Sequence, residues 1–234
     1  MPRTDLTDIT FVLDRSGSMG FIKAATIEAF NGFLSSQCSG DGIAELSLVQ
    51  FDDQYEPMYA GRNVNKAPKL TDRTYQPRGS TALLDAMGRT IVATGQRLSR
   101  LREHKRPGTV IFVTLTDGFE NASREFTLHR INEMIREQRE KYSWQFIFLG
   151  ANQDAIATAA QMGVGADQAM TFAASTTGTM GCFQALGGKL NRVRKARGQG
   201  IMDEVMAFDS ADRAAAAGRD DQQTPDSEPR ESEH

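Results

Sequence analysis

The residues with the clearest capacity for chemistry lie directly after an apolar segment near the N-terminus. Residues 11–19 read Phe-Val-Leu-Asp-Arg-Ser-Gly-Ser-Met, so the carboxylate of Asp14 is followed by the hydroxyls of Ser16 and Ser18. Oxygen ligands of this kind suit a hard cation such as Mg²⁺, which binds one or two carboxylates and keeps several waters. A short motif of this type also occurs in ordinary turns, because Asp and Ser side chains bond to their own backbone.

Two groups far along the chain complement this motif. Thr81 stands at the start of an expected helix, and Asp117 follows the apolar run 110–115. Taken alone, Thr81 is a helix cap and Asp117-Gly118 is a turn. In a parallel sheet, however, strand ends and helix starts meet at one edge, where ligands of α/β sheets bind. The sequence therefore predicts one site for Mg²⁺ or Mn²⁺, made by Asp14, Ser16, Ser18, Thr81 and Asp117.

The pattern Asp14-x-Ser16-x-Ser18, followed by Thr81 and Asp117, resembles the metal-ion-dependent adhesion site (MIDAS) of the von Willebrand factor A domain family. The resemblance covers roughly residues 6–175. It implies that the three hydroxyls bind the metal directly and that the two carboxylates act largely through bound waters. It also implies an open coordination position that takes a Glu or Asp side chain of a partner protein.

The same resemblance indicates what kind of protein to expect. Intracellular relatives often act as adaptors for AAA+ ATPases, so an ATPase of this class is one candidate partner. We therefore expect a metal-dependent protein-binding module of the intracellular bacterial or phage type, and we expect no enzymatic activity.

Apolar runs alternate with helical periodicity along most of the chain. This alternation predicts a Rossmann-like, doubly wound α/β fold, in which helices cover both faces of a mostly parallel sheet. Strands are expected at residues 8–13, 44–51, 110–115, 144–149 and 167–172, and residues 55–59 form an antiparallel edge strand. Helices are expected at residues 21–36, 82–102, 123–141, 152–162 and 177–197, with residues 62–79 as an ordered loop or small hairpin.

The composition changes near the C-terminus. We expect one domain over residues 1–200 and a C-terminal extension over residues 201–217 with a short helix capped by Ser210. Residues 218–234 contain no large apolar side chain, so we expect a disordered tail.

Length and charge exclude several classes of protein. The chain has 234 residues, a net charge of −3 and two cysteines, Cys38 and Cys182, in unrelated contexts. This charge argues against nucleic-acid binding by the whole surface, and the cysteine spacing suggests neither a zinc site nor a disulfide framework. No signal peptide is visible, and no apolar run approaches the roughly 20 residues of a membrane helix. We therefore expect a cytoplasmic protein that does not enter a membrane.

Two alternative functions remain open. The first is a metal-dependent hydrolase or phosphatase, because phosphatases of the haloacid dehalogenase type also begin with a strand that ends in Asp. That chemistry needs a second carboxylate where this chain has Ser16, and no base is evident among His104, His129 and His234. The second alternative is a nucleic-acid-associated factor that uses the basic cluster Lys189, Arg192, Arg194, Lys195 and Arg197. Cations at a helix C-terminus are the simpler interpretation of this cluster.

Overall fold

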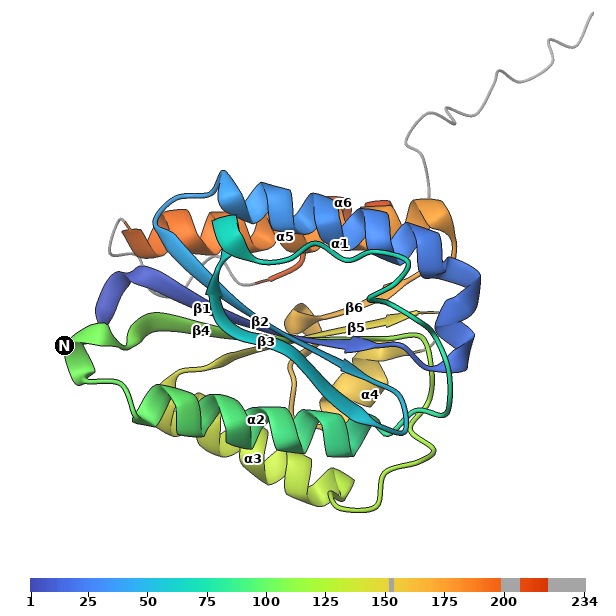
Figure 1. The fold of residues 1–234 in the computed structure, drawn as a ribbon, viewed down its shortest axis with the longest axis horizontal. Coiled ribbons are helices and arrows are strands. Elements are labelled where there is room, and N and C mark those ends of the chain that lie inside the picture. The colour runs from blue at the N-terminus through green and yellow to red at the C-terminus, as the bar shows by residue number, and fades with distance from the viewer. Residues whose placement is uncertain (152–153, 199–206, 219–234) are drawn as a thin grey trace, which may run out of the picture.

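A six-stranded sheet forms the centre of the computed structural model, which describes residues 1–151, 154–198 and 207–218 (Figure 1). The strands are β1 (Arg3–Asp14), β2 (Ile43–Phe51), β3 (Tyr55–Asn63), β4 (Pro107–Thr116), β5 (Gln145–Ala151) and β6 (Ala169–Phe172). Their order in the sheet is β3-β2-β1-β4-β5-β6, and all neighbours are parallel except the antiparallel pair β2–β3. This arrangement confirms the predicted fold class.

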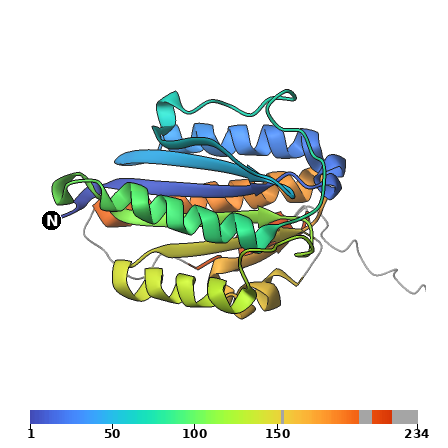
Figure 2. The same cartoon turned by 60° about the horizontal axis from the view of Figure 1, so that its bottom comes forward.

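Helices cover both faces of the sheet. Helices α1 (Lys23–Cys38), α5 (Thr176–Gly198) and α6 (Ser210–Ala216) lie on one face, and α2 (Leu83–Ser99), α3 (Leu128–Tyr142) and α4 (Ala155–Gln161) lie on the other (Figures 1 and 2). The domain has two hydrophobic cores, the first between the sheet and helices α1 and α5, and the second between the sheet and helices α2 and α3. The central strand β1 is buried on both sides, because Phe11 and Leu13 pack in the first core while Val12 packs in the second. Each fully buried side chain of this size contributes about 1.5–3 kcal/mol relative to an exposed one.

The first core has an aromatic centre. Phe11 of β1 stacks on Phe183 of α5, with ring centroids 5.8 Å apart. Phe30 of α1 meets Phe11 edge-on at 5.6 Å. These rings tie α1 and α5 to the strand that ends at Asp14, so the strand end is held in a fixed position.

Several predicted boundaries were wrong. The helix expected from residue 21 is the 3₁₀ helix η1 (Gly17–Ile22) followed by α1. The ordered loop expected from residue 62 begins once β3 has ended at Asn63, and it opens with the short 3₁₀ turn Val64–Lys66. Helix α3 begins at Leu128, not at residue 123. The reason is a long-range contact, because the Asp85 carboxylate accepts hydrogen bonds from the backbone N–H groups of residues 124, 125 and 126.

Helix caps also differ from the prediction. Asp209, and not Ser210, caps α6, where it forms a reciprocal capping box with Asp212. Asp154 caps α4, and residue 152, where this helix was expected to begin, lies outside the described residues. Helix α6 packs on the domain, because the Ala173 N–H bonds to the Ala216 carbonyl at 3.0 Å. The boundary predicted at residue 200 and the tail beyond Gly218 fall outside the described residues.

The strand order has a switch point at β1. The chain passes from β1 to β2 on one side, and later crosses to β4 on the other side of β1. Ligands of open α/β sheets bind outside the carboxyl ends of strands at such a switch point. The carboxyl ends of β1 and β4 are neighbours here, and they carry Asp14 and Thr116.

None of the helices in the described part of the chain is long and apolar enough to cross a membrane.

Candidate metal centre

The predicted ligands on the first and fourth strands meet at the carboxyl edge of the sheet. The Ser16 N–H donates to Asp14 Oδ1 at 2.6 Å, which folds the chain sharply after β1. The Ser16 and Ser18 Oγ atoms are 3.1 Å apart. Ser18 Oγ donates to Asp117 Oδ1 at 2.6 Å, so residues 99 positions apart are in contact. Four of the five predicted ligands therefore form one continuous polar cluster.

The fifth predicted ligand, Thr81, lies near Ser18, and Gly118 leaves open the space between their hydroxyls. A Cβ atom added to Gly118 would lie 2.9 Å from Thr81 Oγ1 and 3.7 Å from Ser18 Oγ. Both hydroxyls therefore face the same small volume, which a side chain at position 118 would fill. Thr81 itself is buried, whereas Ser18 is exposed. The structure thus brings together all five residues that the sequence singles out.

The main interactions of the Asp14 and Asp117 carboxylates include no positively charged side chain. Burial raises the pKa of Asp14 to about 6, against the hydrogen bonds from Thr116 Oγ1 and from Ser16, and the charge of Asp117 raises this pKa further. Burial also raises the pKa of Asp117. A dication in the cluster would lower both pKa values, because it stabilises the ionised carboxylates.

The donor set decides which metal would fit. Among the described residues, no group of three or more His, Cys, Asp or Glu side chains is placed to hold a metal ion. This edge instead offers three hydroxyls and two carboxylates, all of them oxygen donors. Oxygen donors suit Mg²⁺ or Mn²⁺, whereas soft metals prefer sulfur or imidazole ligands.

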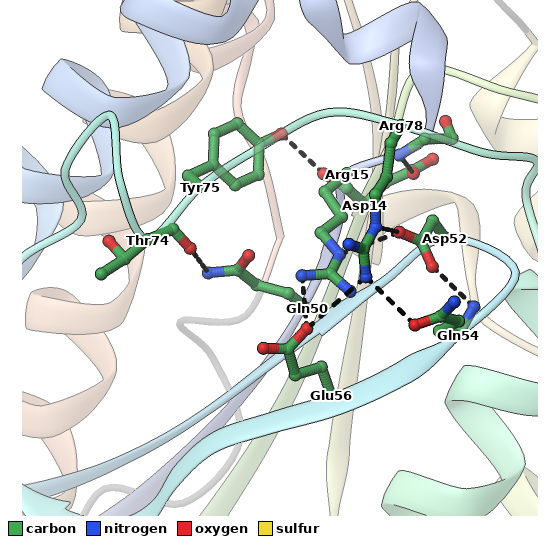
Figure 3. Close-up of polar contacts among 10 residues, drawn as sticks. Asp14, Arg15, Gln50, Asp52, Gln54, Glu56, Thr74, Tyr75 and Arg78 are labelled. Atoms are coloured by element: carbon green, nitrogen blue, oxygen red, sulfur yellow. Dashed lines mark hydrogen bonds and ion pairs between the residues drawn. The ribbon is translucent and has the colours of Figure 1, made fainter.

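An ion cluster centred on the buried Asp52 fixes the loop that follows Asp14 (Figure 3). Arg15 Nε lies 3.1 Å from Asp52 Oδ2, and Arg78 Nε lies 2.9 Å from the same oxygen. Glu56 also pairs with Arg15, at 2.5 Å. Although it follows a strand end directly, Arg15 is only 4% exposed, because it anchors the loop to the turn after β2 and to β3.

The loop before Thr81 is tied to the same strand end. The Tyr75 hydroxyl donates to the Asp14 carbonyl at 2.6 Å, and Gln50 Nε2 donates to the Thr74 carbonyl at 2.9 Å (Figure 3). The Gly17 N–H donates to the Gly79 carbonyl at 3.1 Å. Gly79 has φ +67°, and a side chain there would collide with Asp53, so only glycine fits this turn.

The loop after Asp117 holds Thr81 from the other side. Asn121 Oδ1 accepts the Thr81 N–H at 2.9 Å, and the Asn121 N–H donates to the Thr81 carbonyl at 3.1 Å. Glu120 accepts the Leu84 N–H at 2.9 Å, at the first turn of α2. Sequence reasoning missed Asn121 and Glu120; their only signal was two polar residues after the Asp-Gly turn.

The basic cluster at residues 189–197 is not the solvated face that nucleic-acid binding requires. Lys189 is fully buried, with its Nζ 3.6 Å from the centre of the Phe208 ring. Arg194 is 4% exposed and donates to the carbonyls of Gln37, Gly40 and Gly42. Arg192 pairs with Asp212 at 2.9 Å. Arg192 and Arg194 thus hold α5 against α6 and the end of α1, and Lys189 is enclosed within the domain. This arrangement removes the main support for the nucleic-acid alternative.

A groove of about 1100 Å³ lies at the opposite, amino end of β4 and β5, lined by residues that include Arg106, Trp144 and Tyr142. None of the five candidate ligands lines it. The groove and the candidate metal centre therefore lie at opposite ends of the sheet.

The family model of the von Willebrand factor type A domain matches residues 8–185, which is most of the chain. The chain belongs to this family. A von Willebrand factor A domain therefore carries the hydroxyl and carboxylate cluster described above, and a domain of this family generally mediates protein interactions. The search of curated proteins found no match.

Solved structures show the same fold at low sequence identity. Proximal thread matrix protein 1 from the mussel byssus is 15% identical with a TM-score of 0.53, over 80% of this chain and 46% of that one. The pilus adhesin SpaC from Lactobacillus rhamnosus GG is 13% identical with a TM-score of 0.60, over 80% of this chain and 31% of that one. The manganese-loaded TRAP protein from Plasmodium vivax is 16% identical with a TM-score of 0.52, over 73% of this chain and 69% of that one. This chain thus spans less than half of the mussel protein and of the adhesin.

Proposed function

We propose that this domain binds Mg²⁺ or Mn²⁺ at the carboxyl edge of the sheet and uses the metal to hold an acidic residue of a partner protein. Ser16, Ser18 and Thr81 would be the direct ligands, while Asp14 and Asp117 would act through bound waters. The observation that carries the proposal is the convergence of three hydroxyls and two carboxylates at one edge of the sheet, where Ser18 and Thr81 both lie close to Gly118. Two related structures, one manganese-loaded and one with a zinc-occupied MIDAS motif, support it.

The donor set explains why such a site would take an anion from outside. Hydroxyls are neutral ligands, so they leave most of the charge of a dication uncompensated, and the metal supplies an electrophilic position for a carboxylate oxygen. The N-terminus of the 17-residue helix α2 lies directly after Thr81. Its positive end also favours negative charge at this edge.

The position of the site favours a protein as the ligand. The candidate ligands lie at the end of β1, in η1 and in two loops at the carboxyl edge of the sheet, and Ser18 is exposed. A small-molecule site, by contrast, is typically an enclosed and mostly apolar cavity. We propose a Glu or Asp of a protein partner as the incoming ligand, with an AAA+ ATPase as one candidate partner. Action in the cytoplasm stays a prediction.

A matched pair of serine variants tests this function. We would capture partners from an extract of the native host with wild type, Ser18→Ala and Ser35→Ala, each in Mg²⁺ and in EDTA. Ser35 is a suitable control because its exposed hydroxyl bonds only to the Asn31 carbonyl on α1 among the bonds described. We expect one set of partners that wild type and Ser35→Ala retain in Mg²⁺ and release in EDTA, and that Ser18→Ala does not retain. The same partners on all three proteins in EDTA would contradict the proposal.

We also propose that the domain is not itself a hydrolase. The polar contacts of Ser16 and Ser18 are with one another, Asp14 and Asp117, and no described histidine contacts either hydroxyl. A nucleophilic serine needs a base within hydrogen-bond reach. Turnover of p-nitrophenyl phosphate in Mg²⁺ that disappears in Asp117→Asn would contradict this proposal.

A further inference from the structure

Two phenylalanines break the burial pattern of the chain. The sequence contains thirteen phenylalanines, all of them in the described residues, and ten are buried while Phe126 is partly buried. Only Phe21 and Phe119 are exposed, at 95% and 71%. Each of them lies in a loop or turn that carries candidate metal ligands.

Both phenylalanines belong to segments that carry candidate metal ligands. Phe21 belongs to η1 and follows Ser18 by three residues. Because a 3₁₀ helix has three residues per turn, positions 18 and 21 share one face. Phe119 follows Asp117 by two residues, and Asp117 is hydrogen-bonded to Ser18 at 2.6 Å. The two rings thus belong to the two segments that the Ser18–Asp117 bond joins.

Folding does not account for the exposure of these rings. Within η1 the packing role belongs to Met19 and Ile22, which are 0% and 3% exposed. Phe21 could be any polar residue without loss of core contacts. Exposed aromatic surface beside a polar site is typical of a surface that a partner covers.

We propose that the acidic residue bound at the metal lies in a partner segment with apolar side chains on both sides of it, and that Phe21 and Phe119 contact these side chains. The proposal rests on the function proposed above. The chemistry of the surface determines the occupant, because a cation site selects a carboxylate and the two rings select apolar neighbours. A carboxylate within a charged or polar segment would leave both rings in water, so it binds more weakly.

Synthetic peptides test this specificity directly. The probes are capped peptides with a central glutamate flanked by leucines, a central glutamate flanked by serines, and a central glutamine flanked by leucines. Their affinities would be measured by competition in Mg²⁺ for wild type, Phe21→Ser, Phe119→Ser and Tyr142→Ser. Tyr142 is a matched control, because it is 63% exposed and lines the groove at the opposite end of the sheet.

We expect wild type and Tyr142→Ser to prefer the leucine-flanked glutamate over the serine-flanked one by about tenfold, a value typical of partial burial of two aromatic rings. Phe21→Ser and Phe119→Ser would each reduce this preference at least threefold, with Mg²⁺ affinity unchanged. Equal affinity for both glutamate peptides, with the glutamine peptide much weaker, would overturn this inference and leave the proposed function intact.

Other outcomes overturn more than the apolar contact. Equal affinity for the glutamine and glutamate peptides, or no binding of any peptide in Mg²⁺, would contradict the proposed function as well. Loss of binding to phosphatidylglycerol vesicles in both phenylalanine variants, without a preference among peptides, would assign the rings to a membrane. Loss of self-association in these variants, again without a peptide preference, would assign them to a second copy of this chain.

Discussion

The hydroxyl of Tyr75 provides a sharp test of how the candidate metal centre is held in place. This hydroxyl donates to the Asp14 carbonyl at 2.6 Å, and both residues are 0% exposed. Burial, together with the charges of Asp14 and Asp117, holds the pKa of Tyr75 well above its ordinary value. The phenol therefore stays protonated and remains a donor. Tyr75→Phe removes this bond and leaves the ring in the core.

The expected loss of stability follows from the geometry of the bond. A net hydrogen bond contributes about 1 kcal/mol, and a buried acceptor that loses its partner costs about 1–3 kcal/mol. We therefore expect Tyr75→Phe to lower the free energy of unfolding by about 2 kcal/mol. For a domain of this size, 1 kcal/mol lowers the melting temperature by about 2–4 °C, so the expected decrease is about 4–8 °C.

Tyr59→Phe is the matched control. Its hydroxyl lies 3.5 Å from the Pro68 carbonyl, a weak contact in a more exposed place. Thermal melts and hydrogen exchange would compare the two variants. We expect faster exchange of the Arg78 amide in Tyr75→Phe, because this amide bonds to the Arg15 carbonyl within the same loop contact. Equal melting temperatures for the two variants would refute the idea that Tyr75 fastens the loop to β1.

Three further substitutions test the electrostatics and the geometry of the domain. Burial lowers the pKa of Lys189 to about 7, although the charges of Asp167 and Asp212 oppose this shift. Above pH 7 the unfolded chain therefore binds more protons than the folded chain, and the free energy of unfolding rises from about pH 7 to 10. Lys189→Met is expected to remove this rise in thermal melts, and an unchanged dependence of stability on pH would contradict the lowered pKa of Lys189. Burial raises the pKa of Asp85, but three backbone N–H donors outweigh this effect and hold the pKa below its ordinary value. The resulting stability is present above about pH 4 and is lost as the pH falls further. Asp85→Asn is therefore expected to weaken the loss of stability in acid, and a loss as steep as that of wild type would argue against this role of Asp85. In Gly118→Ala the new Cβ atom would lie 2.9 Å from Thr81 Oγ1. Calorimetry is therefore expected to show a metal affinity reduced by about 10-fold or more, with little change in melting temperature. A metal affinity equal to that of wild type would mean that Thr81 is not a ligand.

Local sequence patterns were sufficient to predict most of the fold. Apolar runs of β1, β4 and β5 are buried on both faces, so their strands were recognisable without any knowledge of the partners. The candidate ligands were predictable for a related reason. Each follows a strand or precedes a helix, and parallel topology alone brings such positions to one edge.

The errors arose where a distant residue decides the local structure. Residues 123–127 have helical periodicity, but Asp85 on another helix captures three of their N–H groups and delays the start of α3 to Leu128. Arg15 has the sequence context of a solvated loop cation. Its burial depends on Asp52 and Glu56, which come from the neighbouring strand and turn.

The supports of the site were missed for the same reason. Tyr75 and Asn121 contact Asp14 and Thr81 across 61 and 40 positions of sequence. Such pairings carry no periodic signal, and only the folded topology brings the partners together. The functional residues were therefore easier to predict than the residues that position them.

The most direct test of the account is Mn²⁺ binding measured by calorimetry on wild type, Asp117→Asn and Asp53→Asn. Asp117 accepts the hydrogen bond of Ser18 at 2.6 Å, whereas Asp53 is an exposed acid in a nearby turn, so both variants change the charge equally. The account predicts one Mn²⁺ per chain for wild type and Asp53→Asn, and an affinity at least tenfold lower for Asp117→Asn. Equal binding by all three proteins, or no binding by wild type, would contradict the central claim that these hydroxyls and carboxylates form a metal centre.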